Sequence, residues 1–173
     1  MNEDASNLIN NLRQLKKNLL IAVEPKKIPI KEEYTDDILP FDLYRDTRQN
    51  IEKIADQINK SFYHEIYDGT AVLMRRLIEM LLILAFKHIG QEDCIRHPNG
   101  DYFQLSDIIN QANQNRQLDL SRNAKEYLGI FKEKGDLSAH NPFHNCRRKD
   151  LELIQHKFRS LIEELFYKVG ILT

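Results

Sequence analysis

The sequence predicts an all-α fold, an up-and-down bundle of five or six helices. Apolar residues recur at helical spacing in one segment after another, short connections with turn residues separate these segments, and no stretch alternates as a half-buried strand does. The chain has 173 residues, with 5 Pro, 6 Gly and 29% charged residues. This composition is typical of one globular domain with peripheral additions, which buries its core without disulfide staples.

Residues 1–24 predict an amphipathic helix, because four leucines follow one another at steps of three or four residues: Leu8, Leu12, Leu15 and Leu19. Residues 25–40 begin and end with proline and predict a linker. The bundle domain is therefore expected over residues 41–173. The leucine face suits packing on that domain, pairing with a second copy, or binding of a partner protein, and the pattern does not choose among them.

The second predicted helix carries five apolar residues at helical spacing and ends near Tyr63: Ile51, Ile54, Ala55, Ile58 and Phe62. The third is expected to start at the turn Asp68–Gly69 and to stop at Gly90. Residues 71–89 are apolar nearly all round, so this helix is expected at the centre of the bundle. Its charged residues, from Arg75 to His88, make insertion into a membrane costly.

A loop over residues 91–104 contains a turn at Pro98–Asp101, and Ser106 is a candidate cap for the short helix that follows. Ser121 is expected to cap a fifth helix. Gly135 is expected to end that helix in a left-handed conformation, so that residues 135–141 form a loop. The final helix is predicted from about Arg148 to Gly170.

A net charge of −1 gives no global attraction to nucleic acid or to an anionic membrane, so an RNA contact requires a local basic patch. The chain opens with Asn2, Glu3 and Asp4 instead of a basic signal region, and no apolar run reaches the ~18 residues of a membrane span. We therefore expect a cytoplasmic protein that does not enter membranes. Cys94 and Cys146 are expected to be reduced thiols.

The segment from Tyr67 to Glu79, the segment from Gly135 to Asn141 and a last helix containing Glu163–Leu165 together resemble the HEPN superfamily. More narrowly, they resemble a branch that pairs an Arg-Arg-Leu-x-Glu central helix with a Gly-Asn/Asp-x-x-Ala-His turn. The resemblance covers roughly residues 40–169 and leaves the leading helix outside.

This resemblance implies a helical bundle that often dimerises and, in active members, cleaves RNA without a metal ion or cofactor. The implied catalytic pair is an arginine followed, after four to six residues, by a histidine. Here His140 supplies the histidine, Lys134 stands in the arginine position, and Asp136 stands where many relatives carry Asn. The implied supporting residues are Arg75, Arg76, Glu79, Asp136 and Asn141.

RNA cleavage by the 2′-hydroxyl needs a group that moves protons and a cation that stabilises the phosphorane, which His140 and Lys134 can supply. Lysine offers a point charge where arginine would bind two phosphate oxygens. A structural alternative has His140 buried between helices, satisfying backbone groups. For Arg75 and Glu79, the alternatives are an ion pair that fixes packing, or a Glu79 that orients His140.

Arg147, Arg148 and Lys149 make a local basic stretch, which is either an RNA-phosphate contact or a solvated helix start. Several His and Cys residues raise the question of a zinc site: His140, His144 and Cys146, with Cys94 and His97. Their spacing matches no standard zinc motif, so we interpret them as scattered residues and predict no metal.

Two functions follow as expectations. One is a HEPN-like RNA-binding domain, which as an enzyme would be a metal-independent endoribonuclease using His140. The other is a non-catalytic module for homodimerisation or protein interaction, in a defence or toxin–antitoxin setting.

Overall fold

Seven α-helices and one 3-10 helix make up the part of the chain that the computed structural model describes, residues 37–172 together with residue 14. In chain order these are α2 (Phe41–Tyr44), α3 (Gln49–Tyr63), α4 (Tyr67–His88), η1 (Glu92–Ile95), α5 (Leu105–Gln114), α6 (Arg122–His140), α7 (Arg148–Glu152) and α8 (Gln155–Val169). Within these residues there is no strand, so the predicted all-α class is confirmed. The predicted leucine face of residues 8–19 lies outside the described residues.

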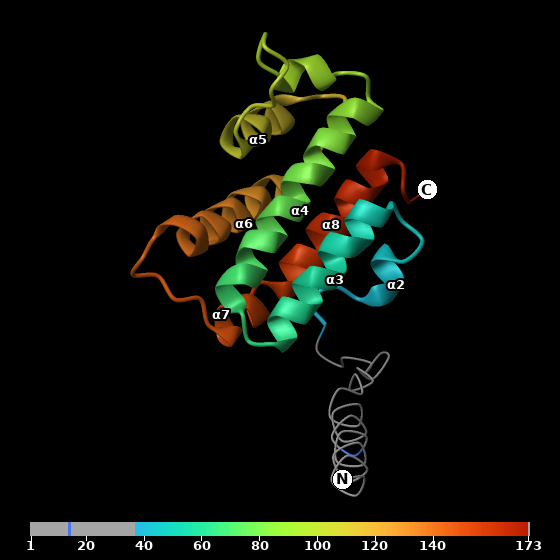
Figure 1. Ribbon diagram of the computed structural model, residues 1–173. Helices are drawn as coiled ribbons and strands as arrows, with labels where there is room; N and C mark the ends of the chain where they lie inside the picture. Colours follow the sequence, from blue (N-terminus) through green and yellow to red (C-terminus); the bar gives the residue numbers. More distant parts are fainter. Residues whose placement is uncertain (1–13, 15–36, 173) are drawn as a thin grey trace, which may run out of the picture. The chain divides into compact units, whose positions relative to one another are not determined.

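Helix α4 lies at the centre of the bundle and packs against α3, α6 and α8 (Figure 1). Apolar side chains cover several of its faces, and Leu77, Leu81 and Phe86 are completely buried. The predicted central position of this helix is confirmed. None of the described helices is both long enough and apolar enough to cross a membrane.

Three of the predicted helix ends are confirmed. The Ser121 hydroxyl accepts the Ala124 N–H at 3.0 Å and so caps α6. Glu164 of α8 in turn accepts the backbone N–H of Ser121 at 2.7 Å and its hydroxyl at 2.6 Å. Gly90 and Gly170 follow the ends of α4 and α8 in the left-handed region, with φ of 69° and 72°.

Two predicted boundaries are wrong. Helix α5 begins at Leu105 after Gln104, so Ser106 lies inside the first turn instead of capping it. The predicted final helix is divided at Leu153 and Ile154 into the short α7 and the longer α8.

Gly135 does not end the fifth predicted helix, and the loop predicted over residues 135–141 is wrong. Helix α6 continues through Gly135 to His140, and Asn141 is its C-terminal cap residue. Gly135 is buried, and a Cβ atom added there would lie 2.5 Å from Cβ of Arg75 on α4. The glycine therefore permits α4 and α6 to approach closely. Close approach of two backbones is a common role of glycine, besides ending a helix in the left-handed conformation.

The core includes residues that precede Pro40. Ile38 and Leu39 are completely buried. Asn59 of α3 binds Leu39 twice, because its Oδ1 accepts the Leu39 N–H at 3.0 Å and its Nδ2 donates to the Leu39 carbonyl at 2.8 Å. Arg159 of α8 donates to the Ile38 carbonyl at 2.9 Å. Side chains thus satisfy the backbone of this segment, as buried non-helical chain requires.

We expect Asn59→Leu to lower the free energy of unfolding by about 2–4 kcal/mol, because the buried N–H and C=O of Leu39 both lose their partner. Urea denaturation measures the change. Gln57→Leu, at an exposed position of the same helix, is the control and should change stability by less than about 0.5 kcal/mol. Equal effects of the two substitutions would contradict the role given to Asn59.

Candidate functional site

A cleft of about 680 Å³ opens between α4, α5, α6 and the chain that follows α6. We call it the α6 cleft. Its polar lining residues are Arg75, Gln104, Ser106, Lys132, Glu133, Asp136, His140 and Asn141. Those on α6 stand at positions 132, 133, 136 and 140, a helical repeat that places them on one broad face of the helix.

Asp136 binds two cations at the wall of the α6 cleft. Its Oδ1 lies 2.7 Å from Nε of Arg75, and its Oδ2 lies 2.6 Å from Nζ of Lys132. Arg75 also pairs with Glu79 at 3.6 Å, which confirms the ion pair predicted within the central helix. The carboxylate of Asp136 therefore connects α4 to α6 across the glycine contact at residue 135.

The pKa of Asp136 lies below its usual value of 3.8. Partial burial raises this pKa, but the hydrogen bond from Lys132 and the positive charge of Arg75 outweigh the effect of burial. A carboxyl group whose pKa is lower in the folded state stabilises the fold above its unfolded pKa. That contribution is lost as the pH falls through the folded pKa.

We expect Asp136→Asn to lower stability by roughly 1 kcal/mol or less at pH 7, since the side chains of the pair are partly exposed and solvent screens them. The difference between variant and native protein should shrink as the pH falls below the unfolded pKa of about 3.9 and then through the lower folded pKa of Asp136. Urea midpoints at pH 7 and pH 3 measure it. Asp107→Asn, at an exposed position of α5, is the control. A difference that stays constant with pH would contradict the ion-pair account.

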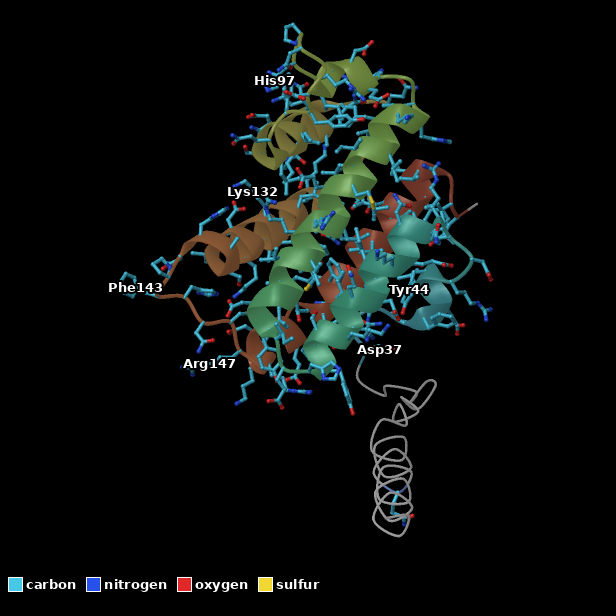
Figure 2. The ribbon with its side chains drawn as sticks, viewed as in Figure 1. Asp37, Tyr44, His97, Lys132, Phe143 and Arg147 are labelled. Atoms are coloured by element: carbon cyan, nitrogen blue, oxygen red, sulfur yellow. The ribbon has the colours of Figure 1, made fainter. Side chains whose placement is uncertain are left out.

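His140 is exposed and lines the α6 cleft as the last residue of α6. The alternative in which His140 is buried between helices is therefore wrong. His140 follows Asp136 by four residues and Lys132 by eight, which places all three on the same side of the helix. Figure 2 shows Lys132 on α6.

The structure does not bring Lys134 and His140 together in the α6 cleft. Six residues of continuous helix separate their directions by roughly 120°. Lys134 instead lies near the Cys146 thiol, and among the described residues Lys132 is the α6 cation that lines the cleft. The expected pairing came from the motif spacing of the resembled family, and both residues here lie on one continuous helix. Arg76 is exposed but does not line the cleft.

Asn141 turns the chain after α6, because its Oδ1 accepts the N–H of Phe143 at 3.0 Å. Phe143 is 95% exposed. Figure 2 shows this ring at the tip of the connection between α6 and α7.

The three residues of the predicted basic stretch at the start of α7 have different surroundings. Arg148 pairs with Glu152 at 3.3 Å and lies over the ring of Phe62 at 4.8 Å, so it fastens α7 to α3. Arg147, labelled in Figure 2, is exposed, and so is Lys149. The Asp150 carboxylate accepts the N–H of Arg147 at 2.9 Å and supplies the negative charge that a helix start favours.

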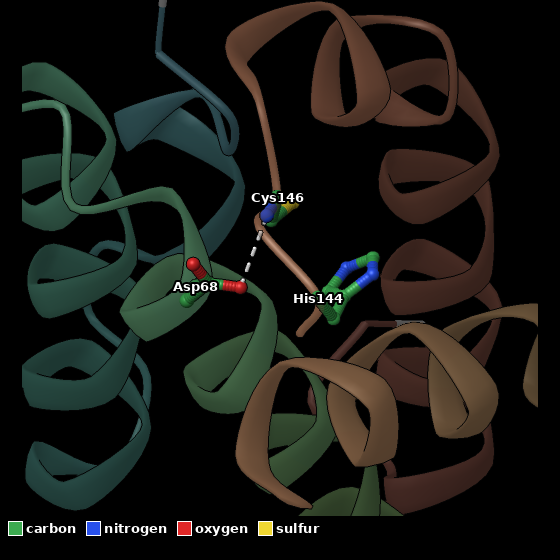
Figure 3. A group of neighbouring side chains, drawn as sticks. All are labelled: Asp68, His144 and Cys146. Atoms are coloured by element: carbon green, nitrogen blue, oxygen red, sulfur yellow. Dashed lines mark hydrogen bonds between the residues drawn. The ribbon is translucent and has the colours of Figure 1, made fainter. Parts of the chain in front are cut away.

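A second polar group forms where the chain between α6 and α7 passes the start of α4 (Figure 3). Its members are Asp68, His144 and Cys146, whose potential ligand atoms all lie within 4.8 Å of one another. The Cys146 N–H donates to Asp68 Oδ1 at 3.1 Å. Burial raises the pKa of the Cys146 thiol; the charge of Lys134 lowers it, while those of Asp150 and Asp68 raise it further.

Sequence reasoning named His144 and Cys146 but missed Asp68, which stands 78 residues before Cys146. It considered Cys94 and His97 as companions and set that grouping aside, and the structure separates both residues from Asp68. Helix α4 spans 22 residues, or about 33 Å, and Asp68 lies in its first turn while Cys94 follows its end. Figure 2 shows His97 and Arg147 at opposite ends of the bundle.

Comparisons with protein-family models, with curated proteins and with solved structures find no match. The resemblance to the HEPN superfamily thus rests on the sequence motifs. Of the residues that it singles out, four line the α6 cleft: Arg75, Asp136, His140 and Asn141.

Proposed function

We propose that this chain is a HEPN-like RNA-binding domain that cleaves RNA without a metal ion at the α6 cleft. The observation that carries the proposal is the exposed imidazole of His140 in a cleft that also contains Arg75 and Lys132. A group that moves protons and two cations near one cavity are the components that phosphodiester cleavage by a 2′-hydroxyl requires.

In the proposed reaction, His140 accepts the proton of an RNA 2′-hydroxyl, and the 2′-oxygen forms a bond to the adjacent phosphorus. The bond from phosphorus to the 5′-oxygen breaks, and a proton moves to that leaving oxygen. The products are a 2′,3′-cyclic phosphate and a 5′-hydroxyl. Negative charge develops on the phosphorane oxygens, where Lys132 and Arg75 stabilise it.

The contact with Asp136 leaves donors available on both cations. A lysine ammonium carries three N–H donors, and Asp136 takes one from Lys132. Nε of Arg75 lies 2.7 Å from Asp136 and Nη1 lies 3.6 Å from Glu79, and a guanidinium has further N–H groups beyond these. Phosphate binding therefore does not require either carboxylate to leave. Asp136 serves to hold the two cations in place.

A second copy of the chain would supply the second proton-transfer group. The resemblance implies a dimer, and Phe143 exposes nearly its whole ring three residues after His140. A dimer contact at Phe143 would bring two copies of His140 toward one substrate, so that one histidine acts as base and the other as acid.

The test is incubation of the full chain with mixed single-stranded RNA, in EDTA and in buffer without it. We expect cleavage in both, with 2′,3′-cyclic phosphate ends identified by mass spectrometry. Absence of cleavage at any protein concentration, together with no RNA binding at low salt, would overturn the proposal. Binding that falls as salt rises, without cleavage, would retain the RNA-binding part alone.

The exposed apolar residues favour a second candidate, a non-catalytic module for dimerisation or protein interaction. Phe143 and Leu153 are 95% and 72% exposed, so both side chains are accessible to a partner. Light scattering on the native protein, on Phe143→Ser and on a chain lacking residues 1–24 tests it. A monomer in all three samples would exclude dimerisation. A dimer lost only in the truncated chain would assign the contact to the leucine face.

A further inference from the structure

We propose that Asp68, His144 and Cys146 bind a zinc ion, which fastens the chain between α6 and α7 to the first turn of α4. This site is separate from the α6 cleft, and the inference does not depend on the proposed function. It differs from the interpretation of these His and Cys residues as scattered.

The three donors form a set that zinc prefers. A carboxylate oxygen, an imidazole nitrogen and a thiolate sulfur are its common protein ligands, and together they are poorly suited to Mg²⁺ or Ca²⁺. Tetrahedral zinc places such atoms about 3.3–3.6 Å apart. The donors here lie within 4.8 Å of one another (Figure 3), so side-chain rotations that move atoms by about 1 Å close the site.

The histidine of this group carries an unmatched polar atom. The Nε2 atom of His144 is buried and has no hydrogen-bond partner among the described residues. Burying such an atom without a partner costs about 1–3 kcal/mol, and proteins seldom retain that cost without a reason. A metal ion bound through Nε2 would provide the missing partner, and one bound through Nδ1 would not.

The carboxylate of this group is already oriented. Asp68 Oδ1 accepts the N–H of Cys146 at 3.1 Å, as the dashed line in Figure 3 shows. This hydrogen bond leaves a second carboxylate oxygen for a metal ion and holds the side chain beside the sulfur. Hydrogen bonds of this kind, from the surroundings to a ligand, tune metal affinity in known sites.

The charges at the group are compatible with a divalent cation. Asp68 and a Cys146 thiolate together carry two negative charges, which Zn²⁺ balances. Lys134 and Asp150 act on the thiol with opposite signs and so offset one another. Residues 1–36 contain no His or Cys, and Cys94 follows the far end of α4. The group has three members among the described residues, so a water molecule or an incoming ligand would complete the fourth position.

A simpler account gives Asp68 only the task of binding the Cys146 N–H at a helix start. That account requires neither the thiol nor the imidazole to bind metal. The two accounts predict different results when the reduced, metal-free full chain is titrated with Co²⁺ and with Zn²⁺.

With zinc binding, we expect one metal ion per chain by elemental analysis, and a thiolate-to-cobalt charge-transfer band with Co²⁺. Cys146→Ser should abolish the band, while His144→Gln and Asp68→Asn should weaken binding at least tenfold. Zn²⁺ should raise the melting temperature of the native chain and not that of Cys146→Ser. Cys94→Ser is the matched control and should retain the band.

Absence of the charge-transfer band in the native chain would overturn the inference, and so would a band that survives Cys146→Ser and disappears in Cys94→Ser. The band is measured first on native protein and on Cys94→Ser, so a ligand variant that fails to fold does not affect the conclusion. Circular dichroism checks the fold of each variant. Because no RNA is present, failure of the proposed nuclease activity and failure of the zinc site are distinguishable.

Discussion

Gly135→Ala is expected to destabilise the protein by about 1–3 kcal/mol, although alanine is the better helix former by about 1 kcal/mol. The added methyl group would lie 2.5 Å from Cβ and 2.7 Å from Cδ of Arg75. Carbon atoms in proteins pack at about 3.5–4.0 Å, so α4 and α6 must separate. The Cβ of Arg75 is fixed to the backbone and cannot rotate away.

The same helix supplies a matched control for this prediction. At Gly129, six residues earlier on α6, an added Cβ meets no atom within 4 Å. Gly129→Ala should therefore stabilise the protein by roughly 0.5–1 kcal/mol through helix propensity alone. If the close approach is real, urea denaturation should give changes in the free energy of unfolding of opposite sign for the two variants. Stabilisation by both substitutions would show that α4 and α6 do not touch at residue 135.

His140→Ala is expected to lower the rate of RNA cleavage by roughly 10²–10⁴-fold, the usual contribution of a general acid or base. RNA affinity should change little, because the binding charges of the α6 cleft belong to Arg75 and Lys132. His156→Ala, at an exposed position of α8, is the control and should cleave at the native rate. A native rate in His140→Ala would remove this residue from the mechanism.

A paired comparison separates the cation that the structure favours from the one that the sequence motif indicates. Lys132 lines the α6 cleft with His140, whereas Lys134 lies near Cys146. Lys132→Ala should therefore lower the cleavage rate more than Lys134→Ala. The reverse order would favour the sequence-based pairing and a rearranged end of α6.

Most of the correct predictions concern features that residues close together in the sequence determine. Ser121 caps α6 through a bond to a residue three positions later, and Gly170 ends α8 through its own backbone angles. The central position of α4 followed from its apolar residues on nearly every face. Each inference needed only neighbouring residues, so no long-range information was required.

Apart from the cap at Ser106 and the division of the final helix, the incorrect or missing structural predictions involve residues that are distant in sequence. A glycine late in a helical pattern suits a helix end and a close helix contact equally well, and only Arg75 on another helix decides in favour of the contact at Gly135. Asn59 was missed because its partner is the backbone of Leu39. Asp68 was missed because nothing near it indicates His144 or Cys146. The expected pairing of Lys134 with His140 came from the motif of the resembled family, which does not specify where α6 ends.

The contact at Gly135 also determines how the α6 cleft meets a ligand. Two of its walls are helices that van der Waals contact holds at one spacing, so the cavity is preorganised. Ligand binding therefore loses little conformational entropy in ordering these walls, and neither α4 nor α6 has to move to enclose the ligand. Selection among ligands at this cavity then depends on fit to a fixed shape, and association is expected in a single kinetic step.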